Sequence, residues 1–551
     1  MRGRRVVAIG LDGLETSVAD RFMASGDMPA LAELRREAAC FVLDHGPAQR
    51  TGLAWEHVAS GRSPEAAQRW AAVEFDPSTY RVWQEGARFT PWWTSLSRSV
   101  VVFDTPYVDL RRAPTTRGVV AWGAHDPGAR LAARPRLLLR DFLQRFGAYP
   151  SKWTYATPWG SVDRSREMGE VLRRALETRG RAAHWLATER LSDWDLFFAV
   201  AGEVHGAIEG LWHGVDANHP LHRHPSAPSA AESLRATHRA LDGMIATLVR
   251  SVGRDAAIVA FAMGGMGPNH SDVQSMVLLP ELLYRHAFDS PLLRVPAPWT
   301  AARDHLPIVG EDEPWNVASC VPLTVDHGRL SRALRSFVQQ RPRLRAGVRA
   351  LQAALLEWRA AAEPIPTRSL DWQPASRYAT HWPRMPAFAL PSFYDGRVRI
   401  NLKGRERDGI VEASRYENVC RNIETLLREC RNPLTGEPAV ESIERASAGD
   451  PLRLGSSESD LLVVWRGVAT ALEHPRLGLI GPVPLRRTGG HTGRYGIAYV
   501  RAPGIRVGDH GVRSAFDVAP TIIELLGCES DAAVSGTSLL TGSGMLNRAS
   551  W

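Results

Sequence analysis

Short runs of consecutive apolar residues recur along the chain, and longer segments with helical periodicity separate them. The runs lie at residues 6–10, 99–103, 195–200 and 255–261. Continuous rather than alternating runs are typical of parallel strands that are buried on both faces. Residues 170–189 and 230–252 carry apolar positions at three- and four-residue spacing, which predicts amphipathic helices. Alternating strands and helices predict an α/β layered fold, in which ligands bind at the carboxyl ends of the strands.

The pattern weakens between residues 288 and 392, where prolines and tryptophans are frequent, although 330–362 has helical periodicity. We interpret this segment as an insertion or cap over the site. Regular elements then return, with predicted strands at 396–402 and 460–465, a helix at 416–430 and a strand and helix at 496–526. The predicted organisation is one core built from residues 1–287 and 393–551, with 288–392 inserted as the cap.

The composition is that of a soluble globular protein, with 44% hydrophobic and 23% charged residues. A chain of 551 residues is too long for one small core and suits several domains or one large sheet with insertions. No apolar run approaches 18 residues, so no membrane-spanning helix is predicted. The first apolar run stops at Asp12 without a cleavage site of small residues, which indicates a first strand and not a signal peptide.

The five cysteines are sparse and form no CxxC pair, which is typical of a reducing compartment and excludes the usual cysteine zinc motifs. We therefore expect a cytoplasmic protein without a membrane partner. The net charge of +8 comes mainly from arginines that are spread along the whole chain. A protein that binds nucleic acid would concentrate this charge in one stripe with aromatic residues, so no nucleic-acid polymer is expected as a partner.

Two residues near the start of the chain are candidates for chemistry. Asp12 ends an apolar strand, where a carboxylate can hold a cation, although aspartate also caps turns and helices. Thr51 precedes Gly52. A threonine hydroxyl becomes a nucleophile only when a metal or base lowers its pKa, and the alternative is a helix cap that faces an anion.

His205 and Glu209 stand four residues apart, a spacing that places both on one face of a helix and suits one metal ion. The alternative for this pair is a surface salt bridge. His491 lies among glycines, which suggests tight packing near a ligand or, alternatively, an exposed loop. Further potential ligands make the region after residue 202 the densest cluster in the chain, namely Glu203, His213, Asp216 and His219.

Taken in order, these segments resemble the alkaline phosphatase superfamily, in its type I phosphodiesterase/nucleotide pyrophosphatase branch. The matching segments are IGLDG at 9–13, TGLAW at 51–55, EVH at 203–205 with Glu209, the glycine-rich run around His491, and DVAPTI at 517–522. The resemblance implies a three-layer α/β/α sandwich with a mostly parallel central sheet and an inserted cap. It also implies that Thr51 is the nucleophile beside a metal held by Asp12, and that His205, Glu209 and His491 hold a second metal.

The chain departs from this family where an Asp-His pair is expected, because Met263 and Gly264 occupy that place. Glycine offers no ligand, and a thioether is a poor ligand for a hard site. We therefore expect a divalent metal, preferably zinc, and one ion rather than two. A second ion would be held only if another side chain replaced the missing ligands. The candidates for this are His270, Asp272, Asp44 and His45.

The resemblance implies a metal-dependent hydrolase or transferase that acts on a small phosphate ester of the phosphodiester or nucleotide type, or less preferably on a sulfate ester. Thr51 would attack in line and form a covalent phosphothreonine. Two alternatives follow from Met263 and Gly264. The chain is then a degenerate member that binds a ligand or partner without hydrolysing it, or an enzyme with one metal and altered group-transfer chemistry. Neither the substrate nor an oligomeric state is predicted.

Overall fold

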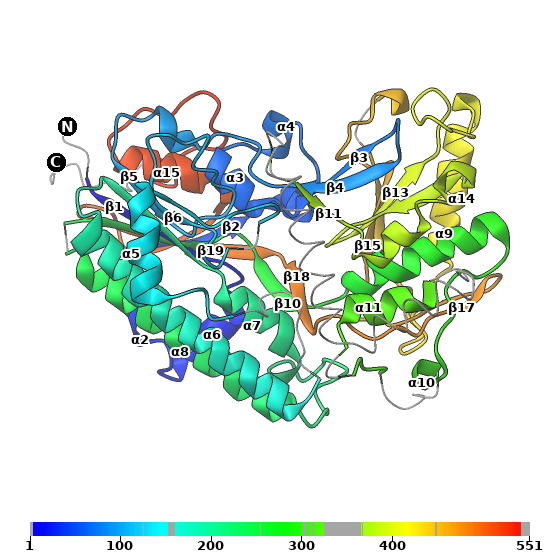
Figure 1. The fold of residues 1–551 in the computed structure, drawn as a ribbon, viewed down its shortest axis with the longest axis horizontal. Helices are drawn as coiled ribbons and strands as arrows, with labels where there is room; N and C mark the ends of the chain where they lie inside the picture. The colour runs from blue at the N-terminus through cyan, green and yellow to red at the C-terminus, as the bar shows by residue number, and fades with distance from the viewer. Residues whose placement is uncertain are drawn as a thin grey trace.

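A computed structural model describes residues 4–124, 126–151, 160–253, 255–300, 306–310, 313–323, 365, 367–446 and 449–541. The predicted helix at 330–362 lies outside these residues. The central feature is a nine-stranded sheet (Figure 1). In sheet order its strands are β20 (Gly508–Ser514), β2 (Ala39–Asp44), β19 (Tyr495–Arg501), β9 (Ala257–Ala262), β1 (Val6–Leu11), β8 (Leu196–Ala201), β5 (Val100–Phe103), β6 (Arg117–Val120) and β7 (Ala132–Arg134).

Most neighbouring strands of this sheet run parallel. β1 pairs in parallel with both β8 and β9, and β5 continues the parallel arrangement between β8 and β6. Only β19 and β7 run antiparallel to their neighbours. The four apolar runs of the sequence form β1, β5, β8 and β9, and every residue of these strands is buried. The prediction of a mostly parallel sheet is confirmed.

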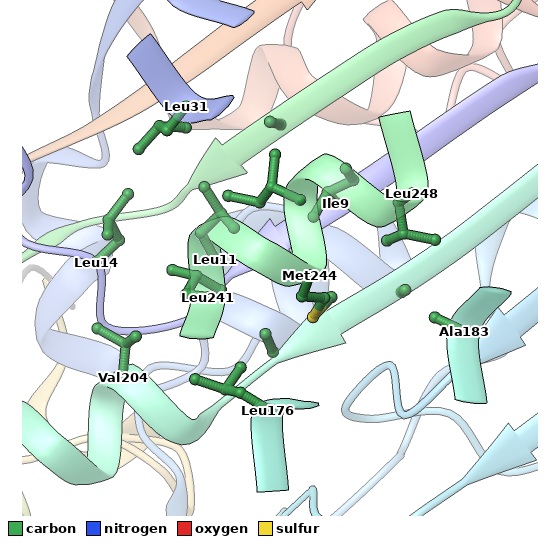
Figure 2. Packing of buried hydrophobic residues seen from close by; sticks show 14 of the residues in the cluster. Ile9, Leu11, Leu14, Leu31, Leu176, Ala183, Val204, Leu241, Met244 and Leu248 are labelled. Atoms are coloured by element: carbon green, nitrogen blue, oxygen red, sulfur yellow. The ribbon is translucent and has the colours of Figure 1, made fainter. Parts of the chain in front are cut away.

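Helices cover both faces of the sheet, so the molecule has the predicted three layers. One face is covered by α1 (Thr16–Ala24), α2 (Pro29–Arg36), α5 (Arg136–Phe146), α6 (Val162–Trp185), α7 (Glu203–Leu211) and α8 (Ala227–Ser251). Figure 2 shows Ile9 and Leu11 of β1 close to Leu241 and Met244 of α8, in a cluster that also includes Leu176 of α6. The opposite face is covered by α3 (Ala54–Ser60) and α15 (Val518–Leu525).

A second lobe with its own apolar core lies beside the main sheet (Figure 1). It contains an antiparallel sheet in the order β12 (Ala387–Leu390), β13 (Gly396–Ile400), β15 (Leu461–Trp465) and β14 (Val440–Arg445). A three-stranded sheet, β11 (Thr367–Ser369), β4 (Arg81–Glu85) and β3 (Val73–Asp76), joins it, as do α9 (Leu279–Phe288) and α14 (Tyr416–Arg428). The segment 288–392 therefore supplies only part of this lobe, because α9 precedes it and β13–β15 follow it.

Residues that follow β1, β8 and β9 line one cavity together with residues of the second lobe. A two-stranded ribbon of β10 (Gly265–Pro268) and β18 (Gly489–Gly493) lies between the two lobes (Figure 1). All five cysteines are free thiols. Among the described helices, none combines the length and the apolarity that crossing a bilayer requires. Further short α-helices and strands are α4 (Pro64–Ala67), α10 (Ala297–Thr300), α11 (Trp315–Cys320), β16 (Leu472–His474) and β17 (Gly478–Ile480).

Candidate metal centre

His205 and Glu209 lie on α7, which begins directly after the carboxyl end of β8. The side chains occupy successive turns of one helix face, and His205 Nε2 is 3.1 Å from Glu209 Oε1. Both side chains are buried, and α7 is buried along its whole length. The spacing in the sequence therefore correctly predicts two potential ligands that point to one place.

His491 reaches the same place from β18, 286 residues further along the chain. Its Nε2 is 2.9 Å from His205 Nε2. Gly489 makes this approach possible, since a Cβ there would meet the carbonyl oxygen of Ile208 at 2.3 Å. The ligand atoms of His205, Glu209 and His491 all lie within 4.8 Å of one another.

Asp12 contacts the other nitrogen of the same histidine, with Oδ2 at 2.9 Å from His205 Nδ1. A carboxylate only accepts, so Nδ1–H donates to Asp12, and this leaves Nε2 facing His491 and Glu209. The adjacent Gly13 has φ +73°, and a Cβ there would lie 2.3 Å from the Cα of His205. Asp12 thus stands in the position of a carboxylate that orients a metal-binding histidine.

The donor set fits a divalent cation. Two imidazole nitrogens and one carboxylate oxygen are the ligands that zinc prefers, and three protein ligands leave a position for water or substrate. The second carboxylate oxygen of Glu209, Oε2, is buried and has no hydrogen-bond partner among the described residues. Such an orphaned anionic oxygen costs free energy unless a cation approaches it.

Arg487 is a cation at this centre that the sequence interpretation did not single out. Its guanidinium forms an ion pair with Glu209, and its Nε lies 3.9 Å from Oδ2 of Asp272. The side chains of Arg487 and Glu209 are only 10% and 2% exposed, so the ion pair is screened little by solvent. The proximity of Arg487 to the glycines of β18 was the available signal, but arginines occur throughout the chain.

The other potential ligands of the cluster after residue 202 are engaged elsewhere. Glu203 forms a buried ion pair with Arg179 at 2.8 Å, which anchors the start of α7. His213 Nε2 is 3.0 Å from the hydroxyl of Ser226. Asp216 accepts a hydrogen bond from the indole N–H of Trp212. His219 Nδ1 accepts a hydrogen bond from the backbone N–H of Leu221.

Thr51 is buried at the end of the turn Gly46–Thr51 and lies next to Gly52, which lines the cavity of this centre. Its hydroxyl donates to the carbonyl oxygen of Ala48 at 2.7 Å and accepts from the N–H of Leu53 at 3.2 Å. Gly52 has φ +71°, and a Cβ there would meet the ring of Tyr394 at 2.3 Å. Position 52 therefore requires glycine, both because φ is positive and because a side chain would collide with Tyr394.

Met263 and Gly264 follow β9 and line the same cavity. A Cβ on Gly264 would lie 3.4 Å from Nε2 of Gln49, whose amide donates to the carbonyl oxygen of Gly493. A glutamine amide thus occupies the space beside the position where the resemblance expects a metal ligand. Three of the four side chains considered as substitutes have other contacts: Asp272 pairs with Arg486, Asp44 pairs with Arg494, and His45 contacts His57. The fourth, His270, does not line the cavity, and its buried Nδ1 has no hydrogen-bond partner among the described residues.

The two buried histidines near Thr51 form a separate pair, with His45 Nε2 at 3.0 Å from His57 Nδ1. Burial lowers the pKa of His45 to about 4, while the nearby carboxylate of Asp44 opposes this shift. Burial also lowers the pKa of His57 well below its usual value. Both rings are therefore neutral at physiological pH, and His45 presents one edge to the cavity.

A cavity of about 960 Å³ connects these groups and extends to the second lobe. Its size is in the range of small-molecule sites. Many of its walls are aromatic, which suits an organic ligand with planar or apolar parts, and the aromatic residues are Trp55, Tyr107, Trp122, Tyr149, Trp315, Trp372, Phe393 and Tyr394.

Neither a protein-family model nor a curated protein matches the sequence. Solved structures are similar over almost the whole chain. Phosphonoacetate hydrolase from Sinorhizobium meliloti, in complex with phosphonoformate, has 14% identity, covers 96% of both chains and has a TM-score of 0.44. Human ectonucleotide pyrophosphatase/phosphodiesterase 5 has 10% identity, covers 99% of this chain and 100% of its own, and has a TM-score of 0.47. The murine protein of the same name has 10% identity, covers 98% and 100%, and has a TM-score of 0.47.

The human and murine proteins carry the name of the branch that the sequence motifs resemble. At these identities and TM-scores the likeness says nothing about what this chain binds or catalyses. The geometry of His205, Glu209 and His491 therefore carries the functional proposal by itself.

Proposed function

We propose that the chain is a metal-dependent hydrolase of small phosphate esters, with one ion, preferably zinc, held by His205, Glu209 and His491. The observation that carries the proposal is the convergence of these ligand atoms within 4.8 Å from two distant segments. Their place at the carboxyl end of a parallel strand, in a cavity of about 960 Å³, supports a catalytic rather than a purely structural ion. The free cysteines support a cytoplasmic setting.

Asp12, Glu209 and Arg487 have different roles in the proposed site. Asp12 holds His205 in the tautomer that presents Nε2, and Glu209 contributes the negative charge. Arg487 places a second cation beside the carboxylate, where it can also meet the oxygens of a phosphoryl group. When bound, a zinc ion supplies positive charge that stabilises phosphoryl oxygens and lowers the pKa of a bound hydroxyl.

Thr51 is the proposed nucleophile. Its Oγ1 forms a bond to phosphorus while the ester P–O bond breaks. The Thr51 hydroxyl gives its proton to solvent, and the leaving alkoxide takes one from solvent to become an alcohol. Water then cleaves the phosphothreonine, which releases phosphate and restores the hydroxyl. The hydroxyl must first leave its hydrogen bond to Ala48, whereas the N–H of Leu53 already points to Oγ1 and would stabilise negative charge there.

A second candidate function is favoured by Met263 and Gly264. Both line the cavity without offering a strong ligand, and the Thr51 hydroxyl donates to the backbone. These observations favour a site that holds one ion and binds an anionic ligand without hydrolysing it, or that transfers the group by altered chemistry. The two candidates share the ion and differ in the role of Thr51.

The test measures zinc content by elemental mass spectrometry and hydrolysis of bis(4-nitrophenyl) phosphate and 4-nitrophenyl phosphate by the purified full chain. We expect one zinc per chain, turnover that a chelator abolishes, and loss of turnover by about 1,000-fold in Thr51→Ala with zinc content unchanged. Thr51→Ser is the matched control and should keep measurable activity. Zinc binding with turnover that is absent, or unaffected by Thr51→Ala, would favour the second candidate.

A further inference from the structure

The wall that the second lobe contributes to the cavity carries an arginine and a glutamine side by side. Arg368 of β11 and Gln84 of β4 are directly opposite partners in an antiparallel pair of strands. Directly opposite residues project from the same face of a sheet, and both of these line the cavity. The neighbouring Glu85 projects from the other face, where it pairs with Arg88.

Arg368 has no carboxylate partner among the described residues, and its side chain is exposed within the cavity. Desolvation by the surrounding protein, and the charge of Arg486, lower the pKa of Arg368 below its usual value. The guanidinium nevertheless remains charged at physiological pH. Arg486 is a second cation near it, and an anion bound by both guanidinium groups would offset their repulsion.

Arg486 fixes the other side of this wall. Its Nη1 is 2.9 Å from Oδ2 of Asp272, and its guanidinium lies 5.0 Å from the ring centre of Trp372. The ion pair and the aromatic contact orient Arg486, while Asp272 balances its charge. Arg368 is therefore the side chain that gives this wall its excess positive charge.

We propose that Arg368, Gln84 and Arg486 bind a second oxyanion, a carboxylate or phosphate, on the same molecule whose ester lies at the His205–Glu209–His491 centre. The substrate class is then a phosphate ester that carries another acidic group, and this inference rests on the proposed function. A planar guanidinium binds either oxyanion through two parallel N–H groups, and the Gln84 amide adds a third donor. The aromatic wall between the two anionic groups suits the organic part of such a molecule.

Binding of stable analogues to the zinc-loaded full chain tests the proposal without turnover. Isothermal titration calorimetry would compare ω-phosphonoalkanoic acids of increasing length with alkylphosphonates of the same length. We expect the acid of the matching length to bind about tenfold more tightly than its alkyl counterpart, and Arg368→Met to abolish this preference. Arg368→Lys should keep part of it, and Gln84→Met should weaken it less.

Arg428→Met is the matched control, because Arg428 is an exposed arginine of the same lobe that does not line the cavity. It should leave the preference unchanged. Alkylphosphonates that bind with no gain from the added acid, or a gain that survives in Arg368→Met, would overturn this inference and leave the proposed function intact. A free carboxylate that competes equally well when it is not attached to the phosphonate would also overturn it. Failure of both ligand series to bind would instead refute the phosphate-ester function and this inference together.

Discussion

β8 and β9 lie on opposite sides of β1, run parallel to it and end at the same edge of the sheet. The chain after β8 enters α7 and delivers His205 and Glu209 to a cluster of potential ligands. The chain after β9 delivers Met263 and Gly264 to the same cavity. Two neighbouring strand ends thus lead into one cavity, and among the described residues the cluster of potential ligands includes side chains that follow β8 and none that follow β9 directly.

The two pairs of histidines near the cavity, His205 with His491 and His45 with His57, also differ in their surroundings. His205 and His491 lie among carboxylates, with Asp12 and Glu209 in contact with His205. His45 and His57 contact each other, and burial keeps both neutral. A carboxylate that accepts from one imidazole nitrogen strengthens the other nitrogen as a metal ligand, and Asp12 stands in this relation to His205, whereas His45 and His57 contact each other.

The largest effect is expected from His205→Ala, which removes the residue that connects Asp12, Glu209 and His491. We expect zinc affinity to fall by more than about 100-fold, because a direct ligand and the anchor of the remaining ones are lost together. Hydrolysis should fall with it. Isothermal titration with zinc measures the affinity.

His222→Ala is the control for this variant, since His222 lies in the loop after α7 and its Nδ1–H donates to the backbone carbonyl oxygen of His213. It should bind zinc like the parent. Unchanged zinc affinity in His205→Ala would mean that the ion binds elsewhere. The residues after β8 would then be no more important for zinc binding than those after β9.

Arg487→Met should have the next largest effect, which is on the free energy of unfolding and depends on whether zinc is bound. Removal of one partner of a buried ion pair leaves Glu209 as an uncompensated charge, which costs about 3 kcal/mol of unfolding free energy in the metal-free protein. Zinc binding compensates the same carboxylate, so the variant should gain more stability from zinc than the parent does. Urea unfolding with and without zinc measures both quantities. Equal stabilisation of variant and parent by zinc would show that Arg487 and the ion do not share Glu209.

The sequence predicts the strands of the main sheet well, because strands buried on both faces read as continuous apolar runs, as in β1 and β8. It does not reveal which sheet a strand joins. The predicted strands at 396–402 and 460–465 form β13 and β15, which lie in the second lobe and pair with each other there. Strand pairing over such sequence distances depends on the whole topology and not on the local pattern.

In the candidate site, too, local relations could be predicted from the sequence and contacts between distant segments could not. The four-residue spacing of His205 and Glu209 is local, so the sequence alone places them on one helix face. The contact of Asp12 with His205 Nδ1 follows from the pairing of β1 with β8, which makes the two strand ends neighbours. Arg487 could not be distinguished from the many other arginines, since only the tertiary fold brings it to Glu209. The roles of these residues and of Thr51 stay predictions.

A smaller effect is expected on the pH dependence of stability, to which buried His45 should contribute. The folded pKa of His45, about 4, lies below the usual value of 6.5, so the stability that depends on neutral His45 is complete above 6.5. It is lost as the pH falls from 6.5 towards 4, and the loss is up to about 2 kcal/mol at pH 5. His45→Gln should therefore lose less stability between pH 7.5 and 5.0 than the parent. Urea unfolding of the metal-free proteins at both pH values measures the difference, and equal losses would contradict the assignment.

The smallest effect is expected from giving the end of β9 the ligands that it lacks. Gly264 tolerates a side chain, because a Cβ there meets only the flexible Gln49 at ordinary contact distances, so Met263→Asp with Gly264→His should fold. The new pair should hold a second zinc at least about tenfold more weakly than the first, since Asp12 already binds His205 and Gln49 must move. Zinc content at saturating metal should rise from one to two per chain. Gly243→His, on the exposed side of α8, controls for incidental binding by an added histidine. A double variant that still holds one ion would mean that the β9 side differs from the β8 side in backbone geometry as well as in side chains.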